Sequence, residues 1–239
     1  IFKIAKSVAG KLPVLVTVNE AGTREAEAAA RAAAKAGADG LMVVPSMVYH
    51  TNPAETVATL NDVANAGGLP VMIYSNKIAY RVDVTCDIME ELAANPLFVA
   101  VKESSDDIRR STDIINRFGD RFDLFTGVDN LAYEALSVGA VGWVAGLVVA
   151  FPKETVQIYQ LMRAGRTAEA LEIYRWFRPL LDLDVSTYLV QNIKLAEALA
   201  IGSTEHVRRP RKPLAGDVRA KAEKVIRDAM AAREELAGG

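Results

Sequence analysis

Phe98-Val99-Ala100-Val101-Lys102-Glu103-Ser104-Ser105 is a segment in which four apolar residues lead into a lysine and polar residues follow at once. This pattern is typical of the carboxyl end of an interior strand in a parallel sheet. An α/β barrel keeps its catalytic groups at that end of its strands. Burial would disfavour the ammonium form of Lys102 and leave an amine that can form a Schiff base with a carbonyl compound. The alternative is a lysine that ends a strand and reaches solvent.

Short apolar runs recur along the chain, and a stretch with helical signals follows each of them. This alternation predicts an α/β protein with parallel strands and crossover helices. From residue 166 the alternation stops and only helical periodicity continues, so we predict a (β/α) barrel unit over residues 1–165 and a three-helix extension over residues 166–239. Six strands fit either an open sheet or a barrel without its first two strands. The apolar runs are 14–18, 40–44, 71–74, 98–102, 124–127 and 142–146.

The bulk composition excludes several classes of protein. The 239 residues are 51% hydrophobic and 24% charged with a net charge of -2, which does not favour a nucleic-acid or anionic-membrane partner. A single cysteine, Cys86, indicates a reducing compartment, and we expect a cytoplasmic protein in which this thiol is inert. No run predicts a signal peptide or a transmembrane span. His50 and His206 lie far from each other and from Cys86, so we expect no metal site.

Four segments occur in the order and spacing of one family: Val71-Met72-Ile73-Tyr74, Val99-Ala100-Val101-Lys102-Glu103, the turn at Gly127 and Gly139-Ala140-Val141-Gly142. In these the chain resembles the dihydrodipicolinate synthase / N-acetylneuraminate lyase family, the class I Schiff-base (β/α)8 barrels. The resemblance implies a TIM barrel with a C-terminal helical extension. It also implies that roughly sixty residues, with the first two strands and a carboxylate-binding turn, would precede Ile1.

The resemblance assigns roles to three residues. Lys102 would be the Schiff-base lysine, and Tyr74, on the neighbouring strand, the tyrosine that moves protons. Adjacent parallel strands lie ~5 Å apart, so a phenol at the end of one strand can reach an amine at the end of the next. Tyr49 falls near a loop tyrosine that crosses a subunit interface in relatives, although the spacing of its loop is shifted. The family also implies a homotetramer built from dimers and a covalent imine with no external cofactor.

Five further residues are candidates for substrate binding: Ser104, Ala79, Gly127, Asp129 and Gly146. Ser104 follows the lysine, and its alternative role is to cap the next helix. Gly127 and Asp129 form the next strand-end turn, where Asp129 matches a position that contacts polyol chains in sialic acid lyases or simply caps a helix. Gly146 is small where a ligand would approach, or it serves a tight barrel turn.

The loop after Tyr74 distinguishes members of the family. Synthases of the lysine pathway place an arginine five residues after this tyrosine to hold a second carboxylate, whereas this chain has Ala79, and a methyl group does not replace that contact. The blocks 78–83, 102–107 and 142–146 look like those of the 1-pyrroline-4-hydroxy-2-carboxylate deaminases of hydroxyproline catabolism. Ser75 and Lys77 depart from that branch, which usually has asparagine and proline there.

The resemblance therefore implies a Schiff-base lyase or hydrolase, most like a deaminase that forms 2,5-dioxopentanoate and ammonia. Rival activities are a 2-keto-3-deoxy sugar-acid dehydratase or aldolase and dihydrodipicolinate synthase, which use the same lysine and tyrosine. A non-catalytic barrel that binds a metabolite and a structural oligomer subunit are alternatives of another class.

Overall fold

The computed structural model describes residues 1–237 as two compact units, one of residues 1–125 and 139–141 and the other of residues 126–138 and 142–237. The strands are β1 (Leu15–Val18), β2 (Gly40–Val43), β3 (Val71–Ser75), β4 (Phe98–Glu103), β5 (Asp123–Thr126) and β6 (Gly142–Trp143). They lie in the order β1-β2-β3-β4-β5-β6, and the pairs from β1 to β4 are parallel. The predicted α/β class with parallel strands in sequence order is confirmed.

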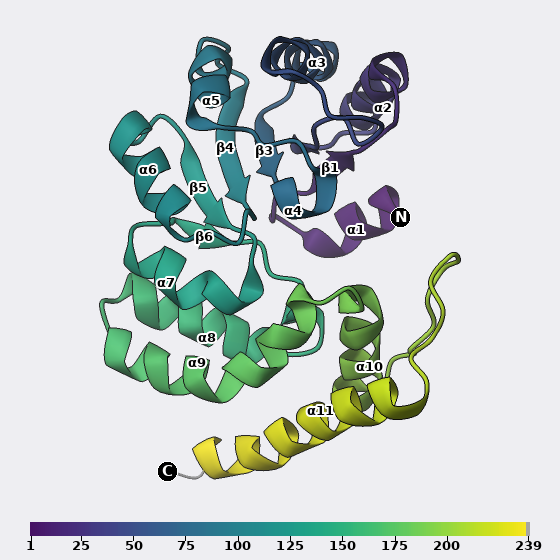
Figure 1. Cartoon of the computed structure of the whole chain (residues 1–239), viewed down its shortest axis with the longest axis vertical. Coiled ribbons are helices and arrows are strands. Elements are labelled where there is room, and N and C mark those ends of the chain that lie inside the picture. The colour runs from purple at the N-terminus through teal and green to yellow at the C-terminus, as the bar shows by residue number, and fades with distance from the viewer. Residues whose placement is uncertain (238–239) are drawn as a thin grey trace. The chain divides into compact units, whose positions relative to one another are not determined.

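Helices connect the strands and cover one side of them in the first unit, where α2, α3 and α5 flank β1 to β4 (Figure 1). The helices of this unit are α1 (Phe2–Ala9), α2 (Thr23–Lys35), α3 (Pro53–Gly67), α4 (Lys77–Tyr80), α5 (Cys86–Ala93) and α6 (Arg109–Phe118).

Capping explains where α3 begins. The Asn52 side chain accepts a hydrogen bond from the Glu55 backbone N–H at 2.9 Å, and the Glu55 carboxylate accepts one from the Asn52 N–H at 3.0 Å. This reciprocal capping box, with Pro53 at the first helical position, satisfies donors that the first turn would otherwise leave unpaired.

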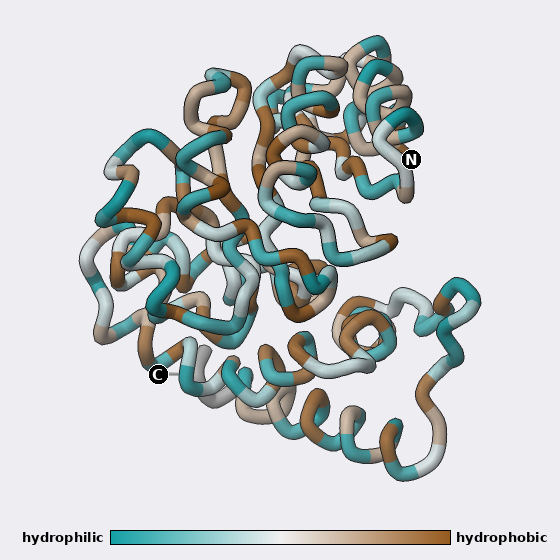
Figure 2. Tube along the Cα trace, turned by 45° about the horizontal axis from the view of Figure 1, so that its top comes forward, coloured by the Kyte–Doolittle hydropathy of each residue, from teal (hydrophilic) through white to brown (hydrophobic). Residues whose placement is uncertain are grey.

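The second unit is mainly helical. Its helices are α7 (Ala132–Ser137), α8 (Pro152–Arg163), α9 (Thr167–Leu181), α10 (Leu189–Ile201) and α11 (Gly216–Ala237), with short 3₁₀ helices η1 (Asp129–Leu131), η2 (Leu147–Val149) and η3 (Asp182–Val185). The trace of α11 alternates between hydrophobic and hydrophilic residues (Figure 2), as an amphipathic helix does when one face packs on a core. No helix in residues 1–237 is long and apolar enough to cross a membrane.

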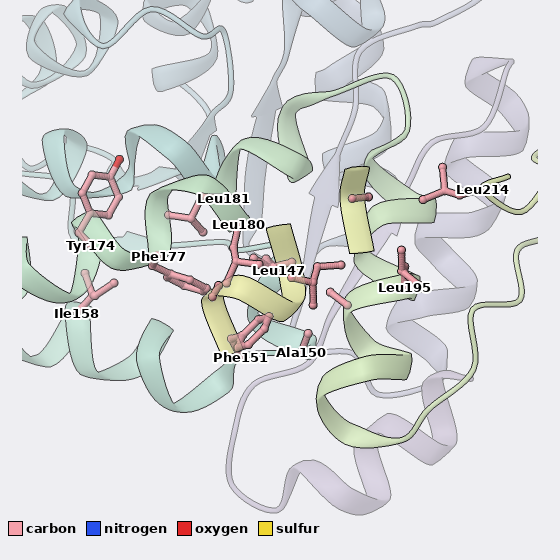
Figure 3. Packing of buried hydrophobic residues seen from close by; sticks show 14 residues of the cluster. Leu147, Ala150, Phe151, Ile158, Tyr174, Phe177, Leu180, Leu181, Leu195 and Leu214 are labelled. Carbon is pink, nitrogen blue, oxygen red and sulfur yellow. The ribbon is translucent and has the colours of Figure 1, made fainter. Parts of the chain in front are cut away.

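Aromatic side chains form the centre of the second unit's core. Phe151 and Phe177 are fully buried (Figure 3) and meet edge to face with ring centroids 5.7 Å apart. Trp176 stacks on Phe177 with centroids 5.5 Å apart. Aromatic pairs in these geometries stabilise a core beyond the area that they bury. The surrounding cluster draws on η2, α8, α9, α10 and α11, so this core is what holds the C-terminal helices together.

We predict that Phe177→Ala lowers the free energy of unfolding by about 3–5 kcal/mol, because truncation leaves a cavity among rings that cannot collapse into it. Urea denaturation followed by tryptophan fluorescence measures this, since Trp143 and Trp176 both belong to this unit. Val156→Ala, at a residue 48% exposed on α8, is the control and should change stability by no more than about 0.5 kcal/mol. Equal midpoints for the two variants would contradict the assignment of the core.

Candidate active site at the ends of strands β3 and β4

Lys102 and Tyr74 lie side by side at the carboxyl ends of neighbouring strands. The register of the parallel pair places Tyr74 directly opposite Lys102. The Lys102 Nζ lies 3.9 Å from the centroid of the Tyr74 ring, over its face. Both side chains are half-buried, so the amine is screened by an aromatic face on one side and remains open to a ligand. The two residues that sequence reasoning paired are thus brought together.

The surroundings of Tyr74 favour its ionised form. Burial alone would raise the pKa of Tyr74, but the positive charge of Lys102 and the hydrogen bonds to its hydroxyl lower that pKa below its ordinary value. One of these bonds comes from the Asn76 Nδ2, which donates to the Tyr74 Oη at 3.4 Å. A phenol whose pKa is lowered beside an amine is better suited than an ordinary tyrosine to accept and return protons.

A second phenol touches the first. Tyr80, the last residue of α4, meets Tyr74 edge to face, with ring centroids 5.4 Å apart and planes at 88°. Burial, then the proximity of Tyr74 and the hydrogen bond between the two hydroxyls, raise the pKa of Tyr80 to about 12. Sequence reasoning gave Tyr80 and Asn76 no role. The available signal was Asn76 three residues before Ala79, the spacing at which an asparagine caps a helix.

A buried ion-pair network fixes the end of β4. Glu103, 5% exposed, accepts hydrogen bonds from the Ser105 N–H at 2.6 Å and from the Arg110 Nε at 3.2 Å. Arg110 also donates to Asp83 at 2.8 Å and to the Val84 carbonyl at 2.8 Å. Burial opposes its charge, yet Glu103 and Asp83 raise the pKa of Arg110. The network joins the residue after Lys102 to the loop after Tyr80, and sequence reasoning missed it.

Three buried serines lie at the same strand ends. The hydroxyls of Ser75, Ser104 and Ser105 have no hydrogen-bond partner in the described part of the chain. Ser104 is tied to the neighbouring strand through its backbone, because its N–H donates to the Ser75 carbonyl at 2.8 Å. Its side chain does not cap α6, which begins at Arg109 without a side-chain cap. Its hydroxyl therefore stays buried without a hydrogen-bond partner among the described residues.

Gly127, Asp129 and Gly146 belong to the second unit. Asp129 is fully buried, and its carboxylate accepts hydrogen bonds from the Trp143 Nε1 at 3.0 Å, from the Gly146 N–H at 3.1 Å and from the Leu147 N–H at 2.9 Å. These bonds shape the loop between β6 and η2. A Cβ on Gly146 would lie 2.7 Å from both carboxylate oxygens of Asp184, so a side chain at this position would require Asp184 to move. Gly127 follows β5 and is half-buried.

Ala79 lies in α4, just after β3, and Tyr49 lies in the loop between β2 and α3. Ala79 is exposed in α4, where its N–H donates to the Asn76 Oδ1 at 2.9 Å. Tyr49 is 56% exposed and borders a cavity of about 190 Å³, which Val18, Val43 and Thr51 also line. Among the side chains that the structure describes, in residues 1–233, no three His, Cys, Asp or Glu gather in a way that would hold a metal ion.

The sequence model of the dihydrodipicolinate synthetase family matches residues 1–229. The chain belongs to this family. A 4-hydroxy-tetrahydrodipicolinate synthase of Geotalea uraniireducens is 28% identical over 217 residues, which cover 89% of this chain and 73% of the relative. An enzyme of the same name from Methanospirillum hungatei is 31% identical over 172 residues, which cover 72% of this chain and 59% of the relative.

Solved structures of the family share the fold. The 4-hydroxy-tetrahydrodipicolinate synthase of Methylacidiphilum fumariolicum SolV superposes with a TM-score of 0.88 at 26% identity, over 97% of this chain and 79% of that one. The dihydrodipicolinate synthase of Aquifex aeolicus gives a TM-score of 0.86 at 24% identity, over 96% of this chain and 78% of that one. The predicted TIM-barrel class with C-terminal helices is thereby confirmed.

We predict that Arg110→Leu lowers the free energy of unfolding by about 3–5 kcal/mol, because it leaves the buried Glu103 carboxylate without its cation. The neighbouring Arg109 pairs with Asp107 on the surface, so Arg109→Leu should change stability by no more than about 1 kcal/mol. Urea denaturation of the two variants makes the comparison. A loss for Arg110→Leu no larger than that for Arg109→Leu would show that the network does not stabilise the strand end.

Proposed function

We propose that the protein is a Schiff-base lyase of a small 2-oxo or cyclic imino acid, with Lys102 as the nucleophile and Tyr74 as the group that moves protons. The observation that carries this proposal is the Lys102 Nζ, 3.9 Å from the Tyr74 ring centroid at the ends of two adjacent strands. Enzymes of this family use a lysine Schiff base and need no external cofactor. Lys102 is half-buried, which suits an amine that must be reached by a substrate.

The chemistry follows from the two side chains. The lone pair of the Lys102 Nζ attacks the electrophilic carbon, and the displaced π pair moves to oxygen, or to nitrogen in a cyclic imine, where Tyr74 supplies a proton. Loss of water, or opening of the ring, leaves a protonated imine on Lys102. This iminium is an electron sink: when Tyr74 as phenolate removes a proton from C3, the electron pair forms the enamine and neutralises the nitrogen.

We propose 1-pyrroline-4-hydroxy-2-carboxylate as the substrate. From its enamine the 4-hydroxyl leaves as water, the ring nitrogen leaves as ammonia, and hydrolysis with two waters gives 2,5-dioxopentanoate and free Lys102, a net uptake of one water. Ala79 supports this choice, because the turn offers a methyl group where a second carboxylate would need a cation. Lys77 pairs with Asp83 at 3.8 Å, so its charge is partly compensated.

Dihydrodipicolinate synthase is the second candidate, because the curated relatives carry that name. In that reaction the aldehyde substrate carries its own carboxylate, so a residue other than residue 79 would have to bind this carboxylate. A 2-keto-3-deoxy sugar-acid dehydratase or aldolase would use the same lysine and tyrosine, with Ser104 near the substrate hydroxyls.

The proposal extends to the assembly. We propose a cytoplasmic homotetramer built as a dimer of dimers, in which the exposed Tyr49 completes the site of a neighbouring subunit. The exposed loop residues Met47 and Val48 beside it are apolar, which suits a surface that is covered by a partner.

Borohydride trapping tests the Schiff base. Reduction in the presence of pyruvate should attach one reduced pyruvyl group to Lys102, detected by peptide mass spectrometry, and Lys102→Ala should abolish the adduct. Lys153→Ala, which removes an exposed lysine of α8, is the matched control and should keep it. An adduct that persists in Lys102→Ala, or forms on another lysine, would exclude Lys102 as the nucleophile.

Substrate profiling tests the choice between deaminase and synthase. The protein should release ammonia from 1-pyrroline-4-hydroxy-2-carboxylate and should not consume aspartate semialdehyde together with pyruvate, with both reactions followed by proton NMR. Ala79→Arg should lower kcat/KM for the first substrate, because it places a bulky cation in the turn beside Tyr80. Synthase activity without ammonia release would overturn the deaminase assignment and leave the Schiff base intact.

A further inference from the structure

We propose that Tyr80 is the proton-relay partner of Tyr74, a positioning residue that exchanges a proton with it during catalysis and connects it to solvent from within the same chain. This inference rests on the proposed Schiff-base function. Its structural basis is the edge-to-face contact of the two rings, with centroids 5.4 Å apart and planes at 88°. An edge-to-face contact is one of the arrangements that aromatic rings prefer, so it holds the Tyr80 ring against Tyr74 without stacking their faces.

The short helix α4 holds Tyr80 in place. Asn76 accepts the Ala79 N–H through its Oδ1 at 2.9 Å, and Arg81 ends the helix in the left-handed conformation with φ 63°. Because a backbone N–H can only donate, this cap determines which way the Asn76 amide points. Its Nδ2 then donates to the Tyr74 Oη at 3.4 Å. One side chain therefore positions both phenols.

The neighbours of the Tyr74 hydroxyl differ in what they can do with a proton. The Asn76 amide group only donates to it, and amides do not titrate at accessible pH. Lys102 is consumed once its nitrogen is bonded to the substrate carbon. Tyr80 can both donate and accept, and it stays free throughout the reaction. It is therefore the neighbour of Tyr74 that can take the proton removed from C3 and later return one.

Solvent access completes the relay. Tyr80 is half-buried, whereas Ile78, Ala79 and Arg81 around it are exposed. Among the described residues, the titratable groups that shift the pKa of Tyr74 are Lys102 on β4 and Tyr80 on α4. The titratable group that shifts the pKa of Tyr80 is Tyr74. The hydrogen bond with Tyr80 contributes to the lowered pKa of Tyr74, as expected when the Tyr80 hydroxyl donates to the phenolate.

The proton transfer balances without any further reactant. When the C3–H bond of the iminium breaks, its electron pair forms the C2–C3 double bond and the proton bonds to the Tyr74 oxygen. Tyr74 then donates to the Tyr80 oxygen as Tyr80 releases its own proton to water. The reverse sequence delivers a proton to the enamine carbon or to a leaving group.

Tyr80→Phe tests the relay with pyruvate as the probe, because it removes the hydroxyl and keeps the ring against Tyr74. Two readouts are compared: the yield of borohydride-trapped adduct at Lys102, and the rate at which the pyruvate methyl protons exchange with deuterium, followed by NMR. The adduct should form at the wild-type level while exchange slows about 10- to 100-fold, the range for loss of one hydrogen bond to a charged group. The rise of the exchange rate with pH should also move to higher pH, because the Tyr74 phenolate has lost a donor.

Tyr133→Phe is the matched control, because it removes a phenolic hydroxyl that donates to the Thr167 carbonyl. In this variant the pyruvate methyl protons should exchange with deuterium at the wild-type rate. Wild-type exchange with an unchanged pH profile in Tyr80→Phe would overturn the relay. A loss of adduct in parallel with the loss of exchange would also overturn it, because Tyr80 would then only support the shape of the site. Absence of any adduct in the wild-type protein would instead overturn the Schiff-base function, and the relay with it.

Discussion

The contact between the Lys102 amine and the Tyr74 ring depends on the register of β3 against β4. Side chains alternate between the faces of a strand, so a shift of one residue would carry one of the two to the opposite face and separate them. Register must therefore be fixed more firmly than strand formation alone requires. The structure fixes it with the direct Tyr74–Lys102 pairing and with the hydrogen bond from the Ser104 N–H to the Ser75 carbonyl just beyond it.

The buried Glu103–Arg110–Asp83 network adds a second constraint at the same strand end. A buried ion pair contributes little net stability, since desolvation offsets its attraction, but it tolerates few alternative arrangements. Here it joins the residue after Lys102 to the loop that follows Tyr80. The strand end that carries Lys102 and the turn that carries Tyr80 are thus tied to one guanidinium, so the geometry of the candidate site depends on Arg110.

The sequence predicted the strands and the Lys102–Tyr74 pair, because each leaves a local signal. The run 98–102 predicted the strand that the structure places at β4 (Phe98–Glu103). Asn52 caps α3 with its side chain. Asn76 has the same capping geometry but was missed, since a four-residue helix has no periodicity that would draw attention to its cap. The Arg110–Asp83 pair spans 27 residues, and no local pattern indicates which partner a buried arginine will find.

The scaffold and the substrate choice are set by different parts of the chain. The strands and the lysine chemistry are common to a family in which relatives at 28–31% identity are synthases. The turn that follows Tyr74 spans only four helical residues, and its chemistry depends on single side chains. Lys77 is engaged by Asp83 and residue 79 is an alanine, so α4 presents a methyl group and a phenol beside Tyr74. A carboxylate has no cation to pair with at position 79, whereas a hydroxyl or a ring nitrogen needs only a proton donor, and a phenol provides one.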